Sequence, residues 1–542
     1  MKRLKRYIFT IIILASFTVT AQKEKYTLQD TLRGTVTEQR AWWDLTYYHL
    51  SVKVNIDQQT ISGSNLIQYQ VLKGRQVLQI ELQSPLKITE VIQNNIKLKI
   101  IKKGYSYFIT LQDEQIVGDI NQLTVFYEGK PQESKNPPWS GGLTWKEDGN
   151  GNPWVVTTCQ GDGASLWWPN KDHAYDEPDS MLISITVPNH LMDVSNGKLR
   201  SVIENKDKTT TYNWSVSNPI NNYGVNMNIA DYAHFSEVYN GLNGELTCDY
   251  YVLKKNLEIA KKQFKEVPRM LKAFEYWFGP YPFYQDGYKL VEVPYAGMEH
   301  QSSVTYGNGF KNGYNGNDVS GSGWGLKFDF IIVHESGHEW FANNITHKDV
   351  ADMWIHESFT SYAENLFVDY HFGTKACNEY AQGIRKNIMN DKPIIGVYNV
   401  HQTGSADMYY KGASMLHTLR QWIDDDKLWR SILTGLNKEF HHQTVSTQQI
   451  ENYISSQSKK DLAPFFNQYL RTIKIPKLEW KKNGNQLTYR YVNVVEGFEM
   501  ALKCNADGKT FWLTPTAKWK TQKNKSDFIV DPNFYIEIEE VK

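Results

Sequence analysis

The residues best able to do chemistry in this chain lie between positions 334 and 357, where histidines and glutamates fall at the spacing of a metal site. His334 and His338 are four residues apart, so on a helix both imidazoles project from one face and can reach a common ion. Glu335 lies at the edge of that face, where it can take a proton from a metal-activated water. Glu357 supplies a third ligand. Two histidines and a carboxylate, with one position left to water, are typical of catalytic rather than structural zinc.

The surrounding sequence decides between a metal site and an ordinary helix, since the same spacing occurs on amphipathic helices whose histidines are simply packed. Residues 330–333 are strongly apolar, as at the start of a buried helix, and residues 354–371 form a second helical pattern that can lay Glu357 against the first. The other nitrogen of a zinc-bound histidine needs a hydrogen-bond acceptor. Asp352 and Glu364 are candidates for that role, with solvated or capping carboxylates as the alternative, and Glu364 shares a helix face with Glu357.

The first residues predict export. Four of the first six are basic, and an apolar run over 7–19 and a small residue at Ala21 follow. This pattern is typical of a secretory signal peptide over residues 1–21, cleaved near Ala21. The run is short for a membrane span, so we expect none after cleavage, with an uncleaved anchor as the alternative. The mature protein is therefore expected in the periplasm or outside the cell.

Composition narrows the class of protein. Loss of the four basic residues leaves 55 basic against 59 acidic residues, a net charge near −4, which does not favour a nucleic-acid partner. Aromatic residues make up 13% of the chain, which favours β-rich layers and an aromatic-lined cleft, and about 520 mature residues predict two to four domains. The four cysteines are widely spaced and form no Cys-x-x-Cys pair, so their spacing does not indicate a metal site. They allow three disulfide pairings, but a chain of this length does not need disulfides, which favours mostly free, buried thiols. They are Cys159, Cys248, Cys377 and Cys504.

Alternation of apolar and polar residues predicts a β-rich N-terminal domain over residues 22–240. The alternation is clear from about 47 to 127 and resumes over 181–187. Between them, residues 136–179 are rich in Gly, Pro and Trp and lack periodicity, so they predict long ordered loops.

A central domain over 241–474 is predicted to carry the metal site. An apolar helical face starts at Leu257 and stops at Phe278-Gly279-Pro280, and a strand is predicted over 288–293. After Ile475-Pro476 the alternation returns, which predicts a small β-sandwich over 475–542. Further helices are expected at 410–424, 427–440, 447–456 and 462–472.

Several segments together resemble a known family. Residues 295–301, Tyr-Ala-Gly-Met-Glu-His-Gln, resemble the Gly-x-Met-Glu-Asn signature of the alanyl aminopeptidase and leukotriene hydrolase family of zinc metallopeptidases, the gluzincins. Residues 354–364 are similar to that family's Trp-Leu-Asn-Glu-Gly-Phe-Ala-x-Tyr-x-Glu segment, and 409–412 to its Tyr-x-Lys-Gly element. Residues 465–476 resemble the end of its catalytic domain. The resemblance covers essentially the whole mature chain. It implies an α+β multidomain fold: a β-rich saddle domain, a thermolysin-like mixed α/β catalytic domain and a short β-sandwich.

The resemblance also implies roles for residues outside the metal cluster. Glu299 is expected to bind the free α-amine of a peptide, in a loop whose Gly297 and Met298 help to hold the substrate. Gln160 resembles a glutamine placed beside that glutamate. Tyr409 is expected to hydrogen-bond the oxyanion of the tetrahedral intermediate. The bland alternatives are a salt bridge for Glu299, a plain loop residue for Gln160 and helix-start packing for Tyr409.

Two departures from the family pattern are Ala296, where glycine is usual, and His300, which replaces asparagine. Ala296 keeps a small residue. His300 is expected to affect affinity or pH dependence near neutrality, because imidazole titrates there. Tyr410 is assigned to the core, and His347, His441 and His442 to the surface.

These observations predict a zinc-dependent aminopeptidase with one catalytic Zn²⁺, which removes N-terminal residues from peptides with a free N-terminus. A carboxylate at a fixed distance from zinc lets only the first peptide bond reach the metal, which makes the enzyme an exopeptidase. The alternatives are a thermolysin-like endopeptidase and a catalytically silent binding protein on the same fold. Epoxide hydrolysis is known in the family, but no residue here favours it.

Overall fold

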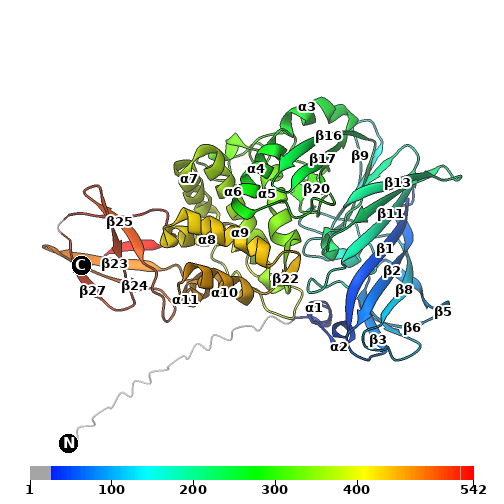
Figure 1. Ribbon diagram of the computed structural model, residues 1–542, viewed down its shortest axis with the longest axis horizontal. Helices are drawn as coiled ribbons and strands as arrows, with labels where there is room; N and C mark the ends of the chain where they lie inside the picture. The colour runs from blue at the N-terminus through cyan, green and yellow to red at the C-terminus, as the bar shows by residue number, and fades with distance from the viewer. Residues whose placement is uncertain (1–25, 525) are drawn as a thin grey trace, which may run out of the picture.

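The computed structural model describes residues 26–524 and 526–542, and the signal peptide predicted for residues 1–21 lies outside this part. The molecule is elongated and has three regions along its axis (Figure 1). An N-terminal β-region adjoins a mixed central region rich in helices, and a small β-region lies at the opposite end. The predicted α+β multidomain class is confirmed.

The N-terminal region is built on an eight-stranded sheet in the order β13-β14-β11-β1-β2-β8-β4-β5. Its long central strands β1 (Trp43–Asn55) and β2 (Thr60–Val71) pair antiparallel, and their alternating burial matches the predicted alternation. The other strands are β4 (Lys87–Gln93), β5 (Ile96–Lys97), β8 (Ile120–Gly129), β11 (Ser180–Pro188), β13 (Lys198–Glu204) and β14 (Thr209–Val216). A three-stranded sheet of β3 (Val77–Glu81), β6 (Lys99–Lys103) and β7 (Ser106–Thr110), with helices α1 (Leu28–Gly34) and α2 (Glu38–Ala41), completes this region.

The prediction of loops throughout residues 136–179 is wrong, because this segment contains β9 (Gly142–Glu147) and β10 (Pro153–Thr158), which pair antiparallel. Their sheet also contains β12 (Met192–Val194) and β15 (Asn228–Ala230). The last four residues of β10 are all buried, so its sequence has no polar face to mark the two-residue period. β10 ends two residues before Gln160 and so carries that side chain toward the central region.

The central region combines a five-stranded sheet, β16-β17-β18-β20-β19, with packed helices. The predicted helix from Leu257 is two helices, α3 (Leu257–Gln263) and α4 (Glu266–Phe278), interrupted at Phe264. The two helices predicted around the metal motif are α5 (Phe330–Gly337) and α6 (Trp354–Phe372). The strands of the sheet are β16 (Tyr232–Gly241), β17 (Gly244–Leu253), β18 (Tyr288–Glu292), β19 (Gly297–Met298) and β20 (Val304–Tyr306).

The remaining helices lie between the metal motif and the C-terminal region. Four of them were predicted: α8 (Tyr410–Ile423), α9 (Asp426–Glu439), α10 (Thr447–Ser458) and α11 (Ala463–Arg471). One, α7 (Thr374–Ile384), was not. A short parallel pair joins β21 (Ile345–His347) to β22 (Gln443–Val445).

The C-terminal region has two sheets, in the orders β27-β24-β23-β29 and β26-β25-β28, as the returning alternation predicted. Their strands are β23 (Lys477–Asn483), β24 (Gln486–Val492), β25 (Leu502–Ala506), β26 (Lys509–Leu513), β27 (Lys520–Lys523), β28 (Ile529–Val530) and β29 (Glu537–Glu540).

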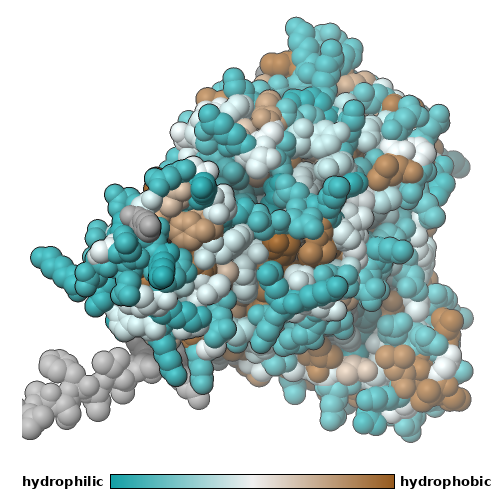
Figure 2. Space-filling view, turned by 60° about the vertical axis from the view of Figure 1, so that its left-hand side comes forward, coloured by the Kyte–Doolittle hydropathy of each residue, from teal (hydrophilic) through white to brown (hydrophobic). Residues whose placement is uncertain are grey.

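All four cysteines are buried and free, as expected for a chain of this size. The face of the molecule in Figure 2 is mostly hydrophilic, with a compact hydrophobic group in a recess near its centre. None of the helices in the described residues is long and apolar enough to cross a membrane.

Candidate active site

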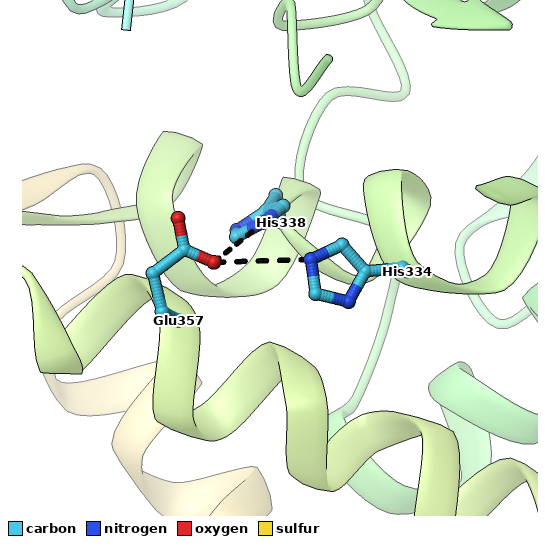
Figure 3. Close-up of side chains that lie close together, drawn as sticks. All are labelled: His334, His338 and Glu357. Atoms are coloured by element: carbon cyan, nitrogen blue, oxygen red, sulfur yellow. Dashed lines mark ion pairs between the residues drawn. The ribbon is translucent and has the colours of Figure 1, made fainter. Parts of the chain in front are cut away.

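The predicted metal ligands lie together at the junction of α5 and α6. His334 lies in α5, whose first turn is capped by Asp329, and His338 directly follows the last residue of that helix. Glu357 comes from the first turn of α6. One carboxylate oxygen of Glu357, Oε2, lies 3.4 Å from His338 Nε2 and 3.8 Å from His334 Nε2 (Figure 3). All three side chains are buried. The apolar stretch before His334 fixes this geometry because it buries the start of α5 in the core.

The hydrogen bonds around these side chains fit a bound cation. His334 Nδ1 lies 2.8 Å from Glu364, and His338 Nδ1 lies 3.1 Å from the carbonyl of Phe341. A carboxylate and a carbonyl only accept, so both Nδ1 atoms carry the proton and both Nε2 lone pairs face the cluster. Oε2 of Glu357 is buried with no hydrogen-bond partner. The three ligand atoms lie within 4.8 Å of one another, and two imidazoles with one carboxylate fit catalytic zinc.

Of the two carboxylates expected to orient the histidines, only Glu364 does so. Asp352 instead accepts hydrogen bonds from Thr447, the first residue of α10, and from the hydroxyl of Tyr398 in a preceding turn. Asp352 lies just before α6 in sequence, but its side chain points to α10. This contact forms between segments that are far apart in sequence, so the local sequence did not indicate it. The placement of His347 at the surface is also wrong. It is buried, and its ring contacts that of His356, which precedes Glu357.

Glu335 is placed to act as a base beside the metal site. It is buried, and burial, reinforced by the negative charge of Glu299 and opposed by His334, raises its pKa to about 7. Gly297 on β19 makes this packing possible. A Cβ at Gly297 would lie 2.7 Å from Ile331 and 2.9 Å from Glu335, so only glycine lets the strand approach α5 this closely.

Glu299 and Gln160 meet next to the metal ligands, although 139 residues separate them. The amide of Gln160 donates to Glu299 Oε1 at 2.6 Å and to Glu357 Oε1 at 2.7 Å. Glu299 is only 2% exposed, and one of its oxygens lies within 4.8 Å of ligand atoms of Glu335 and His338. Burial raises the pKa of Glu299, His338 opposes this shift, and the carboxylate of Glu357 adds to it.

Tyr409 stands at the start of α8, with its ring 6.1 Å from that of His334. Burial, together with the negative charges of Glu357 and Glu299, holds the pKa of Tyr409 well above its usual value. Gly412, one turn later, lets α8 press against α6, since a Cβ there would lie 1.9 Å from Ser358 Oγ. Tyr410 packs against the core, as expected, but it also lines the active-site cavity.

His300 does not face this cavity. It is fully buried, its Nδ1 lies 3.2 Å from Thr305 Oγ1, and burial lowers its pKa to about 3. The imidazole is therefore neutral near pH 7. The expectation that His300 titrates near neutrality is wrong. Although His300 directly follows Glu299 in sequence, its side chain points into the interior of the protein and not into the site.

The cavity itself has a volume of about 330 Å³ and lies between the N-terminal and central regions. Gln160 and Trp139 line it from the N-terminal side, and Trp139 is 69% exposed. The central region contributes the metal ligands, Glu299 and Glu335 to the lining, together with apolar side chains that include Tyr314, Phe330 and Met389. The sequence analysis did not assign Trp139, Tyr314, Phe330 or Met389 to this cavity. The high aromatic content had predicted an aromatic-lined cleft without naming its residues, and the lining by Trp139, Tyr314 and Phe330 agrees with it.

Comparison with known proteins identifies the family of this chain. The peptidase M1 N-terminal domain matches residues 45–223, and the peptidase family M1 domain matches residues 262–469. The chain belongs to the peptidase M1 family. The family resemblance found in the sequence is therefore confirmed, and the cluster of His334, His338 and Glu357 is the zinc site of an M1 metallopeptidase.

This M1 peptidase is similar to aminopeptidase 2 of Candida albicans, with 20% identity over 465 residues that cover 81% of the chain and 48% of the relative. It is similar to glutamyl aminopeptidase of Rattus norvegicus, with 22% identity over 417 residues that cover 70% of the chain and 42% of the relative. The chain thus spans about half the length of these relatives.

Among solved structures, an M1 zinc metallopeptidase from Deinococcus radiodurans has the same fold, with a TM-score of 0.67 at 18% identity. The match covers 81% of this chain and 96% of that one. The Deinococcus protein has also been solved with a Tyr-Ser-Ala substrate bound.

Proposed function

We propose that this M1 peptidase is a zinc aminopeptidase that removes the N-terminal residue from peptides with a free α-amine. The observation that carries the proposal is the buried carboxylate of Glu299, which lies beside the metal ligands and is held by Gln160. A buried carboxylate favours a cationic partner. A peptide whose ammonium group binds there has only its first peptide bond within reach of the zinc site.

His334, His338 and Glu357 would hold the metal, and zinc bound there would supply Lewis-acid polarisation of the scissile carbonyl and acidification of the attacking water. Glu335 takes the proton from that water and gives it to the leaving amine. Burial shifts the pKa of the Glu335 carboxyl above its usual range, which favours a group that takes up and releases a proton. Tyr409 donates its hydroxyl proton in a hydrogen bond to the developing oxyanion.

The relatives support this activity. Aminopeptidase 2 and glutamyl aminopeptidase are aminopeptidases by name, and the Deinococcus metallopeptidase binds a tripeptide as substrate.

The test is cleavage of one short peptide by the zinc-loaded protein, in free-amine and N-acetylated forms. Release of the first residue from the free form alone is the expected result. Equal cleavage of both forms would make the protein an endopeptidase, and cleavage of neither would favour a silent binding protein.

We further propose that the protein is exported, to the periplasm or beyond, because the first 21 residues have the composition of a cleavable signal. Mass spectrometry of the protein from its native host should find a mature N-terminus near Gln22. An intact N-terminus at Met1 would contradict export by this route.

A further inference from the structure

An exposed tryptophan lines the active-site cavity from the N-terminal region. Trp139 is 69% exposed, and it borders the cavity beside Gln160. A single exposed apolar side chain on a protein surface is ordinary and needs no explanation. Trp139 differs because it continues an apolar lining that includes Phe330 and Met389. An apolar group that enters the cavity can therefore cover part of the indole and remove it from water, which is favourable.

The loop that carries Trp139 is fastened to the turn that carries Gln160. The backbone N–H of Gly141, two residues after Trp139, donates to the carboxylate of Asp162 at 2.6 Å. Asp162 in turn lies two residues after Gln160. A Cβ at Gly141 would lie 2.4 Å from the side chain of Leu166, so only glycine allows this close approach. Trp139 and Gln160 therefore belong to one hydrogen-bonded unit of the N-terminal region.

This unit places Trp139 near the first residue of a bound peptide. Gln160 donates to the carboxylate of Glu299 at 2.6 Å, and Glu299 is proposed to bind the α-ammonium group. The α-carbon of the first residue is one bond away from that nitrogen, so its side chain must start in the same part of the cavity. Met298, which precedes Glu299, also lines the cavity. The first side chain is therefore the part of the peptide that Trp139 is best placed to contact.

The apolar lining from the central region is held in place as well. Met389 is exposed and lines the cavity. The backbone N–H groups of Met389 and Asn390 donate to the two carboxylate oxygens of Asp407 at 2.8 and 2.5 Å. Asp407 is buried and lies two residues before Tyr409, the proposed oxyanion donor. These hydrogen bonds tie Met389 to the segment that carries Tyr409, so the lining has a fixed shape on the central side too.

The charges around the cavity favour an apolar side chain over an acidic one. The carboxylates that line it belong to Glu299, Glu335, Glu357 and Asp407. An acidic first side chain would meet these like charges, and it would also lose hydration on entering the cavity. An apolar first side chain has no charge to desolvate, and it covers Trp139 and the apolar lining instead.

We propose that Trp139 is a specificity-determining residue, which binds a large apolar side chain on the first residue of the peptide. This inference rests on the proposed aminopeptidase function and names the class of its preferred substrates. An aromatic first residue should gain most, because its ring can pack against the indole edge-to-face or in an offset stack. Peptides that begin with phenylalanine should therefore be better substrates than peptides that begin with alanine.

The test compares three free peptides, Phe-Ala-Gly, Ala-Phe-Gly and Ala-Ala-Gly, by kcat/KM for release of the first residue by the zinc-loaded enzyme. Trp139→Ala changes an exposed position, so the fold should be retained. We expect Trp139→Ala to lower kcat/KM for Phe-Ala-Gly by about tenfold and to leave the other two values within about twofold of the wild type. Trp139→Phe keeps an aromatic ring and should retain most of the preference for Phe-Ala-Gly over Ala-Ala-Gly. Trp519→Ala is the matched control and should change none of the values, since Trp519 is an exposed tryptophan that packs over Arg490 in the C-terminal region.

Several results would overturn the role of Trp139. One is a wild-type enzyme that does not prefer Phe-Ala-Gly to Ala-Ala-Gly, and another is a preference that Trp139→Ala leaves unchanged. A loss confined to Ala-Phe-Gly would mean that the indole contacts the second residue, and an equal loss on all three peptides would mean that the loop only supports Gln160. Failure of the wild type to release the first residue of any of the three peptides is a separate result, which would overturn the proposed function and this inference with it.

Discussion

The hydrogen bond between Glu364 and His334 should determine how tightly zinc is held. Both groups are buried, and Glu364 Oε1 lies 2.8 Å from His334 Nδ1. The bond fixes the ring so that Nε2 faces the metal, and it makes that nitrogen a stronger donor to the ion. The other oxygen of Glu364 accepts from Tyr380 at 2.6 Å, so the carboxylate cannot easily turn away.

Glu364→Ala should therefore weaken zinc binding by about 10- to 100-fold, which corresponds to about 1.4–2.8 kcal/mol. Glu364→Gln keeps an acceptor oxygen but loses the charge, so its zinc affinity should lie between those of the alanine variant and the wild type. The measurement is a competition for zinc against a chromophoric chelator, with thermal unfolding of each metal-free protein as a check on folding.

Asp352→Asn is the matched control, because Asp352 is an equally buried carboxylate near α6 whose partners belong to other elements. It should lower the unfolding temperature by weakening the start of α10 and leave zinc affinity unchanged. If Glu364→Ala binds zinc as tightly as the wild type, the Nδ1 contact does not control the metal. If Asp352→Asn loses zinc to the same extent, the effect is general destabilisation.

Three further results are expected. Glu335→Gln should retain zinc and lose about 10²–10⁴-fold in kcat, and a smaller loss would contradict its role as base. Tyr409→Phe should lower kcat by about 10²–10³-fold with little change in KM, and an unaffected kcat would remove Tyr409 from the oxyanion site. His300→Asn should leave the pH profile of kcat/KM unchanged between pH 6 and 8. Because the unfolded imidazole binds a proton near pH 6.5 and the folded one only near pH 3, the wild type should lose about 2 kcal/mol more stability than this variant between pH 8 and pH 5 in denaturant unfolding.

Local patterns were sufficient to predict most elements of the fold. The metal site could be predicted from spacing, because two histidines four residues apart lie on one face of a helix. The helical period of α6 then indicated that Glu357 could lie against that face. The same approach missed β10, whose last four residues are buried without alternation. It also missed α7, although the buried residues Ala376, Cys377, Tyr380, Ala381 and Ile384 follow a helical period.

Contacts across the chain could not be predicted in the same way. Gln160 was noticed only through a family resemblance, since nothing near it in sequence indicates Glu299 as a partner. The environment of His347 was wrongly predicted, and the structure bears out the capping alternative for Asp352, which accepts from the backbone of Thr447. Tertiary packing determines whether such side chains are solvated or buried.

The charges of the site provide a reason for a free N-terminus to be recognised there. Zinc with the carboxylate of Glu357 leaves one net positive charge, while Glu299 and Glu335 bring two negative charges into the same buried space when ionised. The immediate cluster then has one uncompensated negative charge, and its burial makes that charge costly. The ammonium group of a free N-terminus balances it, whereas an acetylated terminus leaves it unpaired. Discrimination against blocked peptides would therefore follow from the charge balance of the whole cluster, with Gln160 holding the carboxylate of Glu299 in place.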